Sequence, residues 1–206
     1  TVVGSPFSSA MIGTFIYMGD GSYYEVSNVI TTTSAYISRD FPGATGTFSP
    51  TEWHSPLVRN VELRGFTVKN TNSGSGSSVD AALIRIVAVD RIRIEDIKVQ
   101  DLAYTGAGVT NAGIKIHDSS FVEINNCESS YNTGIGFYVD FCGNIRITNS
   151  SAIRNTSDGF QLGSDLAAPC QIYGCNAYSN GGDGFDVTQI FTTIALCDAQ
   201  ENTGDG

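Results

Sequence analysis

Basic residues are scarce in this sequence: 11 Lys and Arg stand against 21 Asp and Glu, which gives a formal net charge of -10. Nucleic-acid binding needs a stripe of positive charge, and none is visible, so we expect no nucleic-acid partner. Long apolar runs are missing too, and without about eighteen consecutive apolar residues we expect no membrane span. Neither absence argues against a sugar as a binding partner.

Proline, tryptophan and paired cysteines are also few. The chain has 5 Pro and 1 Trp against 23 Gly, and many Ser, Thr and Asn accompany the glycines, as in turn-rich all-β proteins. The 5 Cys form neither a C-x-x-C motif nor a Cys/His cluster, so we expect no metal site and no other cofactor. At 206 residues, 41% of them hydrophobic, the chain could form one domain or two.

What the sequence has instead is a five-residue phrase that returns four times. It runs from an Asn to a Gly, at Asn132–Gly136, Asn155–Gly159, Asn180–Gly184 and Asn202–Gly206. Successive Asn residues are 23, 25 and 22 positions apart, which indicates a repeat fold with one coil per phrase. Turn-forming residues make up the phrase and alternating apolar and polar residues follow it, which predicts a turn and then a strand.

Other positions repeat with the same period. An apolar-polar-apolar triplet recurs in successive coils and predicts a strand, and a bend residue follows it two positions later. The triplets are Val61–Leu63, Ile92–Ile94, Val122–Ile124, Ile145–Ile147, Cys170–Ile172 and Thr192–Ile194, and the bend residues are Gly65, Asp96, Asn126, Asn149, Gly174 and Leu196. The early coils are about thirty residues long, so residues 72–78 and 104–111 are expected to be longer loops.

This pattern of short coils, stacked apolar positions and Asn-rich bends resembles the right-handed parallel β-helix of pectate-lyase-like proteins over residues 58–206. The expected fold is therefore all-β, a single-stranded solenoid in which each coil buries its apolar side against the next. The four Asn residues of the phrase would form a ladder, and Phe137, Phe160 and Phe185 one inner column. Because Gly206 closes a turn phrase, we expect the stack to be truncated at this end.

Two further columns have structural explanations. Cys127, Cys175 and Cys197 each precede a phrase Asn by five residues, with Ser150 at that place in the remaining coil. A column of small buried side chains accounts for them, and disulfides are the alternative.

The Asp residues of the phrase, Asp158, Asp183 and Asp205, admit two interpretations as well. They could bind calcium, but the nonapeptide spacing of calcium-binding β-rolls is absent. We therefore favour turn-forming Asp residues over a calcium site.

Residues 1–50 lack the period and contain strand-like runs at residues 11–18, 23–30 and 34–37, so we expect a β-rich N-terminal segment. The order of the stretches Ile16–Val26, Thr33–Ile37 and Phe41–Gly46 resembles a β-rich segment of bacteriophage tail proteins. That resemblance implies a homotrimer and a virion tail or extracellular location. Residues 51–57 are expected to be a loop, in which Trp53 either stacks on a sugar ring or pins the loop to the body.

Alternation also predicts which residues face outward in the strand after each phrase and in the equivalent strand of the coil before the first phrase. They are Lys115 and His117, Tyr138 and Asp140, Gln161 and Gly163, and Asp186 and Thr188. Since His117 and Asp140 are one period apart, as are Lys115 and Tyr138, each pair should lie on neighbouring strands about 5 Å apart. The result is an outward patch of one base, one acid, one phenol and one ammonium.

The stretch Gly113–Asp118, followed by Gly136–Asp140, resembles the catalytic coils of alginate (mannuronan) C5-epimerases. In that family a Gly-Phe-Asp-Pro-His-Glu strand is followed one coil later by Gly-Phe-x-x-Asp. By this resemblance His117 matches the family's His, Asp118 its Glu, and Asp140 its Asp.

The sequence departs from the epimerase pattern at two positions, because Lys115 replaces the family's first Asp and Ala112 stands where a catalytic Tyr is expected. Removing the C5 proton of a uronate needs a base near neutral pH, a group that neutralises the carboxylate, and an acid. His117 is the candidate base, Lys115 the carboxylate ligand, and Tyr138 the proton donor.

Other interpretations remain open. Paired carboxylates perform hydrolysis, with Asp140 and Asp186 as candidates. The candidate substrate-binding residues are Asp118, Gln161, Asp186 and Trp53. Alternatively, the outward strands of any β-helix must show polar residues, and a His and an Asp among them need no catalytic role.

The function favoured by the sequence is that of a polysaccharide-directed protein similar to phage tail spikes or tail fibres, which binds a bacterial surface glycan and could also degrade it. The alternatives are a secreted uronate C5-epimerase or polysaccharide lyase, and a structural β-helix module without a ligand.

Overall fold

The structure is a computed structural model that describes residues 15–17, 23–31, 34–37, 52–54, 58–70, 81–103, 111–163, 169–188 and 191–206. The chain divides into two compact units, Thr1–Val58 and Arg59–Gly206. The predicted loop at residues 72–78, and residues 104–110 of the predicted loop at 104–111, lie outside the described residues.

The N-terminal unit contains one antiparallel sheet. Its strands are β1 (Phe15–Tyr17), β2 (Tyr23–Thr31), β3 (Ser34–Ile37) and β4 (Glu52–His54), in the order β3-β2-β1-β4. The first three strands fall in the predicted strand-like runs. Strand β4 forms inside the segment expected to be a loop, because it pairs along β1 with Trp53 opposite Ile16. Three residues carry too little alternation to reveal such a strand, so only the pairing shows it.

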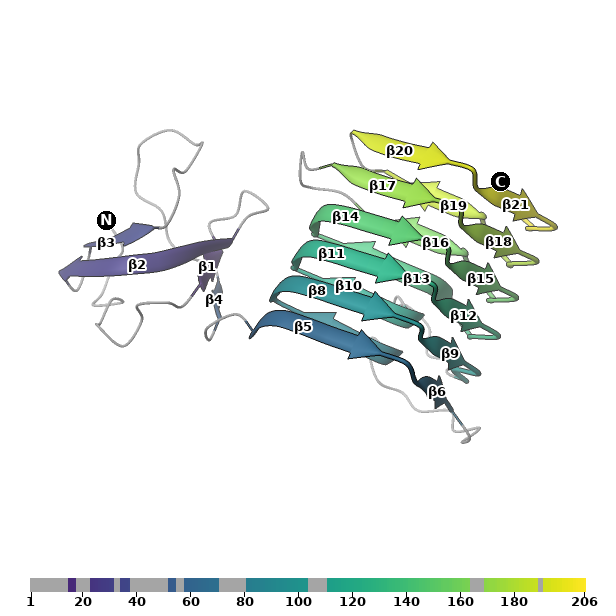
Figure 1. The fold of residues 1–206 in the computed structure, drawn as a ribbon, viewed down its shortest axis with the longest axis horizontal. Helices are drawn as coiled ribbons and strands as arrows, with labels where there is room; N and C mark the ends of the chain where they lie inside the picture. Colours follow the sequence, from purple (N-terminus) through teal and green to yellow (C-terminus); the bar gives the residue numbers. More distant parts are fainter. Residues whose placement is uncertain are drawn as a thin grey trace. The chain divides into compact units, whose positions relative to one another are not determined.

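From Val58 onward the chain forms the predicted right-handed parallel β-helix, drawn as stacked arrows in Figure 1. Three strands make up a typical coil, and they build three parallel sheets. Sheet A contains β7 (Ala82–Val87), β10 (Ala112–His117), β13 (Ile135–Asp140), β16 (Phe160–Leu162) and β19 (Phe185–Val187). Sheet B contains β5 (Val58–Arg64), β8 (Val89–Glu95), β11 (Ser120–Asn125), β14 (Gly143–Thr148), β17 (Cys170–Tyr173) and β20 (Thr192–Ala195). Sheet C contains β6 (Thr67–Lys69), β9 (Lys98–Gln100), β12 (Glu128–Ser130), β15 (Ser151–Ile153), β18 (Asn176–Tyr178) and β21 (Asp198–Gln200).

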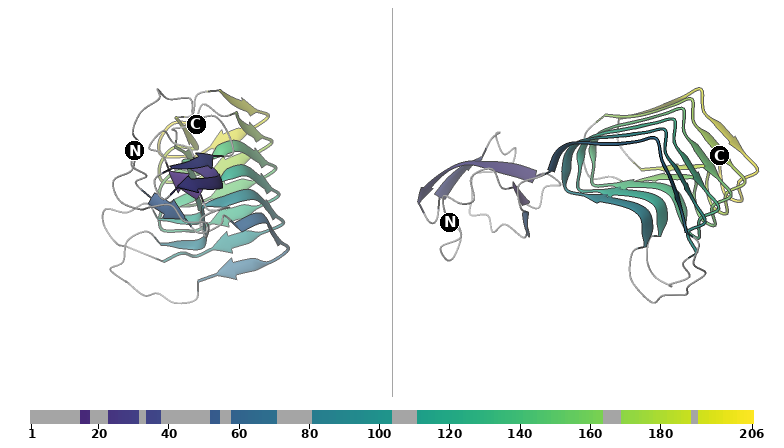
Figure 2. Two further views of the ribbon diagram at one scale, coloured as in Figure 1. Left: turned by 90° about the vertical axis from the view of Figure 1, so that its left-hand side faces the viewer. Right: turned by 60° about the horizontal axis from the view of Figure 1, so that its bottom comes forward.

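A single residue in left-handed backbone makes each bend from sheet B to sheet C. The bend residues predicted from the repeat all have positive φ angles: 70° at Gly65, 56° at Asp96, 51° at Asn126, 49° at Asn149, 63° at Gly174 and 54° at Leu196. Gly, Asn and Asp tolerate this conformation best, which explains their use at five of the six positions. Because an equivalent position bends every coil, successive coils follow similar outlines, as the right-hand view of Figure 2 shows.

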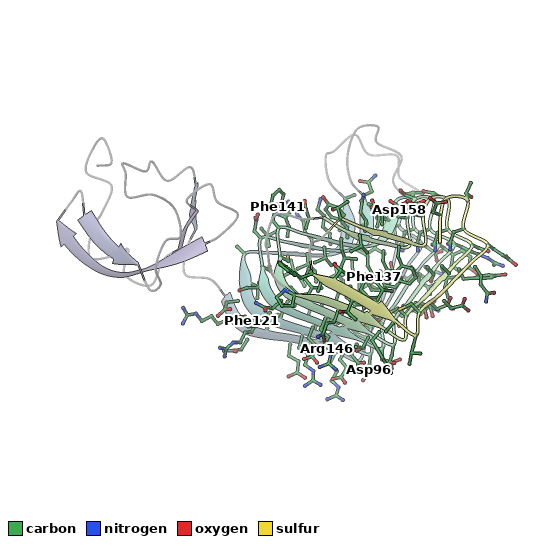
Figure 3. The ribbon with its side chains drawn as sticks, turned by 90° about the horizontal axis from the view of Figure 1, so that it is seen from above. Asp96, Phe121, Phe137, Phe141, Arg146 and Asp158 are labelled. Carbon is green, nitrogen blue, oxygen red and sulfur yellow. The ribbon has the colours of Figure 1, made fainter. Side chains whose placement is uncertain are left out.

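The interior is filled by columns of apolar side chains. Phe137, Phe160 and Phe185 lie in register on three strands of sheet A, as predicted. Successive ring centroids are 4.8 Å and 4.9 Å apart, and the rings are nearly parallel, at 3° and 7°. Figure 3 shows Phe137 inside the coils. The ring spacing equals the strand spacing of a sheet, so each coil adds one layer to a continuous core.

The predicted asparagine ladder is also present. The side-chain amide of Asn132 donates to Asn155 Oδ1 at 2.9 Å, Asn155 donates to Asn180 Oδ1 at 3.0 Å, and Asn180 donates to Asn202 Oδ1 at 2.9 Å. Each of these oxygens also accepts the backbone N–H of the preceding ladder residue. The first three Asn residues are almost completely buried, so the ladder satisfies polar groups that water cannot reach.

The ladder explains why the phrase ends in glycine. A Cβ atom on Gly136 would lie 2.8 Å from Asn155 Nδ2, and a Cβ on Gly159 would lie 2.9 Å from Asn180 Nδ2. The carbonyl oxygen of the next coil's glycine would be closer still, at 2.5 Å and 2.7 Å respectively. The Asn side chain of one coil therefore occupies the space that a side chain on the preceding coil's glycine would need.

The cysteine column agrees with the interpretation of small buried side chains. All five cysteines are free thiols. The backbone N–H of Cys127 donates to Ser150 Oγ at 3.1 Å, and that of Cys175 lies 3.4 Å from Cys197 Sγ. These side chains satisfy backbone groups at the bend into sheet C, and no disulfide is needed.

Candidate functional site

The outer face of sheet A carries the residues singled out by strand alternation. Lys115 pairs in register with Tyr138, and His117 with Asp140, which confirms the predicted adjacency. Gln161 and Asp186 extend the first column on β16 and β19. The second column continues through Gly163 and Thr188. One face of one sheet therefore brings together the candidates from β10 to β19.

His117 ends strand β10, and two carboxylates flank its ring. Its Nδ1 donates a hydrogen bond to Asp118 Oδ2, and its Nε2 lies 3.8 Å from Asp140 Oδ2. Asp118 has a φ of 53°, so the chain turns there and brings its carboxylate back to the ring. Ser119 then holds this turn, because its hydroxyl donates to the His117 carbonyl at 3.0 Å and accepts from the Val89 N–H at 3.1 Å.

The carboxylate of Asp140 is fixed by its own neighbours. Oδ2 accepts a hydrogen bond from the Tyr138 hydroxyl at 2.8 Å, and Oδ1 accepts from the Phe141 N–H at 3.0 Å. Gly163 leaves room for this carboxylate, because a Cβ there would lie 2.3 Å from Asp140 Oδ1. The Phe141 ring meets His117 edge to face at 5.1 Å. Two hydrogen bonds therefore hold the Asp140 side chain in place beside the imidazole.

These surroundings raise the pKa of His117 above the usual value of 6.5. The hydrogen bond to Asp118 is the main cause, and the negative charges of Asp118 and Asp140 add to it. Burial and the charge of Lys115 act in the opposite direction. The side chain of His117 is 30% exposed, so this imidazole is accessible to a ligand while two carboxylates stabilise its protonated form.

Lys115 differs from the expectation. It occupies an outward position of the strand, but it is only 5% exposed. Its Nζ lies 4.7 Å from the centre of the Tyr138 ring in the next coil, a cation–π contact. The expectation that Lys115 offers an exposed ammonium to a substrate is therefore wrong, because packing of the long side chain against neighbouring groups buries it.

The remaining predicted residues lie at greater distance from His117. Gln161 Nε2 donates to Asp186 Oδ2 at 2.9 Å. The backbones of Asp140 and Asp186 are two strands and two residues apart, about 12 Å, which is a wide separation for a hydrolytic carboxylate pair. Trp53 lies on β4 of the N-terminal unit, and its side chain is outside the described residues.

Two residues of this surface were not singled out in the sequence. Arg85 pairs with Lys115 in register and is exposed, so it places a guanidinium one coil before the buried ammonium. Continuing the column back by one thirty-residue coil would have found it. Phe141 follows β13 in left-handed backbone, with a φ of 48°, and no sequence signal places its ring against His117.

The sequence matches the family described as right-handed β-helix region over residues 2–206. The chain belongs to this family. Neither the curated proteins nor the solved structures contain a match. The family match and the parallel sheets establish the fold of this right-handed β-helix protein, and its activity has to be argued from the surface of sheet A.

The turn phrase of this β-helix protein uses its Asp residues as hydrogen-bond acceptors. Asp158 Oδ1 accepts the Asp183 N–H at 2.8 Å, and Asp183 Oδ1 accepts the Asp205 N–H at 2.7 Å. Within the described ranges, no three His, Cys, Asp or Glu side chains cluster closely enough to hold a metal ion. Among those same residues, no helix has the length and hydrophobicity that crossing a membrane requires.

Proposed function

We propose that this right-handed β-helix protein is directed to a bacterial surface polysaccharide, as phage tail spikes are, and that it binds the glycan along the outer face of sheet A. We further propose that it cleaves the chain at a uronate residue by β-elimination. The observation that carries the proposal is the His117–Asp118 pair beside the fixed carboxylate of Asp140.

His117 has the arrangement of an oriented general base. Because its Nδ1–H donates to Asp118, the lone pair of the neutral imidazole lies on Nε2. A carboxylate on the far nitrogen fixes the tautomer and the ring orientation, and it stabilises the imidazolium that forms when the base takes a proton. The raised pKa makes His117 a stronger base than an ordinary histidine, at the cost of a smaller neutral fraction near pH 7.

The proposed β-elimination moves one proton from C5 to O4 of the uronate. Nε2 of His117 takes the C5 proton of the uronate, the C5–H electrons form the C4=C5 double bond, and the C4–O4 bond breaks. The leaving O4 receives a proton from the Tyr138 hydroxyl, which donates to Asp140 in the resting protein. Arg85, exposed one coil away, is the cation suited to the uronate carboxylate. Solvent then takes the proton from His117 and returns one to the Tyr138 hydroxyl.

A C5-epimerase is the second candidate, because His117 and Asp140, which correspond to a His and an Asp of the epimerase pattern, lie side by side on neighbouring strands. Its first proton transfer is the same, but a second group, for which Tyr138 is the candidate, then donates a proton to C5 from the opposite face, and no bond to O4 breaks. The two reactions therefore need the same base and differ in their products.

The test is to incubate the protein with a panel of uronate-containing polysaccharides. β-Elimination is followed by the ultraviolet absorbance of unsaturated uronate, and epimerisation by the uronate composition in NMR spectra. His117→Ala should lower the rate by about 10²–10⁴-fold, the usual contribution of a general base. Asp198→Asn, which changes an exposed carboxylate on sheet C, is the matched control and should leave the rate unchanged.

Four results would count against the proposal or parts of it. If the His117→Ala variant keeps full activity, His117 is not the base. If the wild-type protein inverts uronates without producing unsaturated ends, the epimerase is correct. If it binds an acidic glycan without altering it, the surface is a binding site only, and if it neither binds nor alters any, the proposed function is wrong.

A further inference from the structure

The outer face of sheet B carries a column of charges that alternate in sign from coil to coil. Arg93 pairs in register with Glu123, and Glu123 with Arg146. Thr67 of this first coil pairs with Lys98 of the next coil in sheet C. The same difference in residue number places Glu62 of β5 beside Arg93 of β8, so Glu62 belongs to the same column. In chain order the four side chains are negative, positive, negative and positive. We call Glu62, Arg93, Glu123 and Arg146 the charge column.

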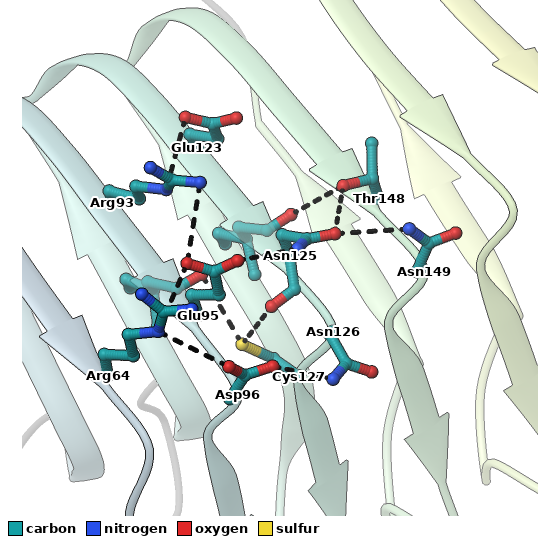
Figure 4. Close-up of polar contacts among 12 residues, drawn as sticks. Arg64, Arg93, Glu95, Asp96, Glu123, Asn125, Asn126, Cys127, Thr148 and Asn149 are labelled. Carbon is teal, nitrogen blue, oxygen red and sulfur yellow. Dashed lines mark hydrogen bonds and ion pairs between the residues drawn. The ribbon is translucent and has the colours of Figure 1, made fainter.

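The charge column is only partly neutralised within the chain. Arg93 Nε lies 3.8 Å from Glu123 Oε2, and another guanidinium nitrogen of Arg93 lies 3.5 Å from Glu95 Oε2, as Figure 4 shows. The side chains of Arg93 and Glu123 are nevertheless 50% and 45% exposed. Within the part of the chain that the structure describes, Glu62 and Arg146 at the two ends of the column form no ion pair. Two opposite charges therefore remain at the ends.

When this order of charges is reversed, every position faces a charge of the opposite sign. Consider a second copy placed face to face, related by a two-fold axis that runs along the strands between β8 and β11. Glu62 then meets Arg146 of the second copy, and Arg93 meets its Glu123; each contact occurs twice, as an isologous interface requires. A parallel arrangement of coils would instead bring Arg93 against Arg93 and Glu123 against Glu123.

From this geometry we propose that two copies of the protein associate antiparallel through the outer faces of sheet B. The interface leaves the outer face of sheet A open, so glycan binding there is compatible with it. A parallel trimer packed through sheet B is disfavoured, because it would align like charges.

An aromatic side chain sits close to the proposed axis. Phe121 on β11 is 51% exposed, and the guanidinium of Arg91 on β8 lies 5.7 Å from the centre of its ring. Reversal of the coil order places the Phe121 of each copy opposite the Arg91 of the other. A depression of about 300 Å³, lined partly by Glu62, Arg91, Arg93 and Phe121, lies between these coils and can receive a side chain of the second copy. Burial of Phe121 would thus add an apolar contribution to the charge pairing.

The size of the face predicts a weak dimer. With the axis between β8 and β11, only β5, β8, β11 and β14 of the two copies overlap; four strands spaced by about 4.8 Å and six residues at about 3.3 Å per residue cover about 19 by 20 Å. Two such faces bury on the order of 800 Å², which is below the range of stable specific interfaces and corresponds to a transient contact. We therefore expect a reversible dimer whose dissociation constant rises with salt concentration, because its central contacts are ionic.

Sedimentation equilibrium of the complete chain over a concentration series tests the proposal. The wild type should approach the dimer mass at low salt. Glu123→Arg should weaken dimerisation at least about tenfold, because two pairs of like charges then face each other. The matched control is the double variant Arg93→Glu with Glu123→Arg, which restores complementarity with the signs exchanged and should restore the dimer. A wild type that stays monomeric or forms a trimer overturns the proposal, as does a Glu123→Arg variant that dimerises normally.

Cysteine cross-linking tests the antiparallel orientation directly. A Glu62→Cys chain mixed with an Arg146→Cys chain should form a mixed disulfide under diamide oxidation, while Glu62→Cys alone should not cross-link. The wild-type chain measures the background from native thiols, because Cys197 is partly exposed while the other four cysteines are buried. Cross-linking of Glu62→Cys with itself, without the mixed product, would mean a parallel arrangement and would refute the inference even if the protein dimerises.

Discussion

The asparagine ladder allows a quantitative test of what holds the coils together. Asn155 is 2% exposed, and its side chain takes part in four hydrogen bonds. Its Oδ1 accepts from the backbone N–H and the side-chain amide of Asn132, at 3.2 Å and 2.9 Å. Its Nδ2 donates to Ser129 O and Asn180 Oδ1, both at 3.0 Å. Asn155→Ala removes all four and leaves the buried N–H of Asn132 without its side-chain acceptor.

The expected loss follows from these contacts. A buried donor left without a partner costs about 1–3 kcal/mol, and each of the other three hydrogen bonds contributes about 0.5–1.5 kcal/mol. We therefore expect Asn155→Ala to lower the free energy of unfolding by about 5 kcal/mol, a large part of the ~5–15 kcal/mol of a typical domain. Urea unfolding followed by far-ultraviolet circular dichroism, with linear extrapolation, measures the change.

Asn202→Ala is the matched control, since Asn202 has the same role in the last phrase but is only half-buried. Its amide oxygen accepts from Asn180, and its amide donates to Ala177 O at 3.0 Å. Water can replace these partners, so we expect a loss of about 1 kcal/mol. If Asn155→Ala costs no more than Asn202→Ala, burial of the ladder does not stabilise the coils and the reasoning is wrong.

Three further predictions concern other parts of the β-helix. Gly159→Ala should destabilise by about 3 kcal/mol in the same urea assay, because its Cβ would overlap a carbonyl oxygen and the ladder amide of the next coil; an unchanged midpoint would show that the coils can separate at no cost. Because the pKa of His117 is raised in the folded state, its stabilising contribution is full below about pH 6.5 and is lost as the pH rises through the folded value. The stability advantage of the wild type over His117→Gln should therefore shrink on going to alkaline pH, and Asp118→Asn should remove most of this dependence. Burial raises the pKa of Cys142 to about 12 and that of Cys175 to about 11, so neither should react with a thiol reagent at neutral pH until the protein unfolds; rapid labelling of the native protein would contradict this.

The repeat could be recognised in the sequence because each coil places similar residue types at equivalent packing positions. The phrase Asn residues, the bend residues and the three stacked Phe rings were all placed by counting positions, and the structure confirms each set. Counting also placed His117 beside Asp140. The early coils are longer than the later ones, and the column of outward residues was not followed back into them. Arg85, which pairs with Lys115, was therefore not predicted.

Side-chain burial and local strand pairing could not be predicted from the spacing of the repeat. Lys115 occupies an outward position, but whether an outward side chain meets solvent depends on neighbours that the repeat does not encode. The placement of Phe141 against His117 depends on left-handed backbone after β13. Strand β4 similarly exists through its pairing with β1.

The sequence alone determined the β-helix, because the height of one coil is set by the spacing of hydrogen-bonded strands, and residues one coil apart must then be neighbours. Only the tertiary structure decided the chemistry of the surfaces. The hydrogen bond between His117 and Asp118, the burial of Lys115 and the exposed ends of the charge column each depend on how side chains turn within a coil, and no period in the sequence specifies that direction.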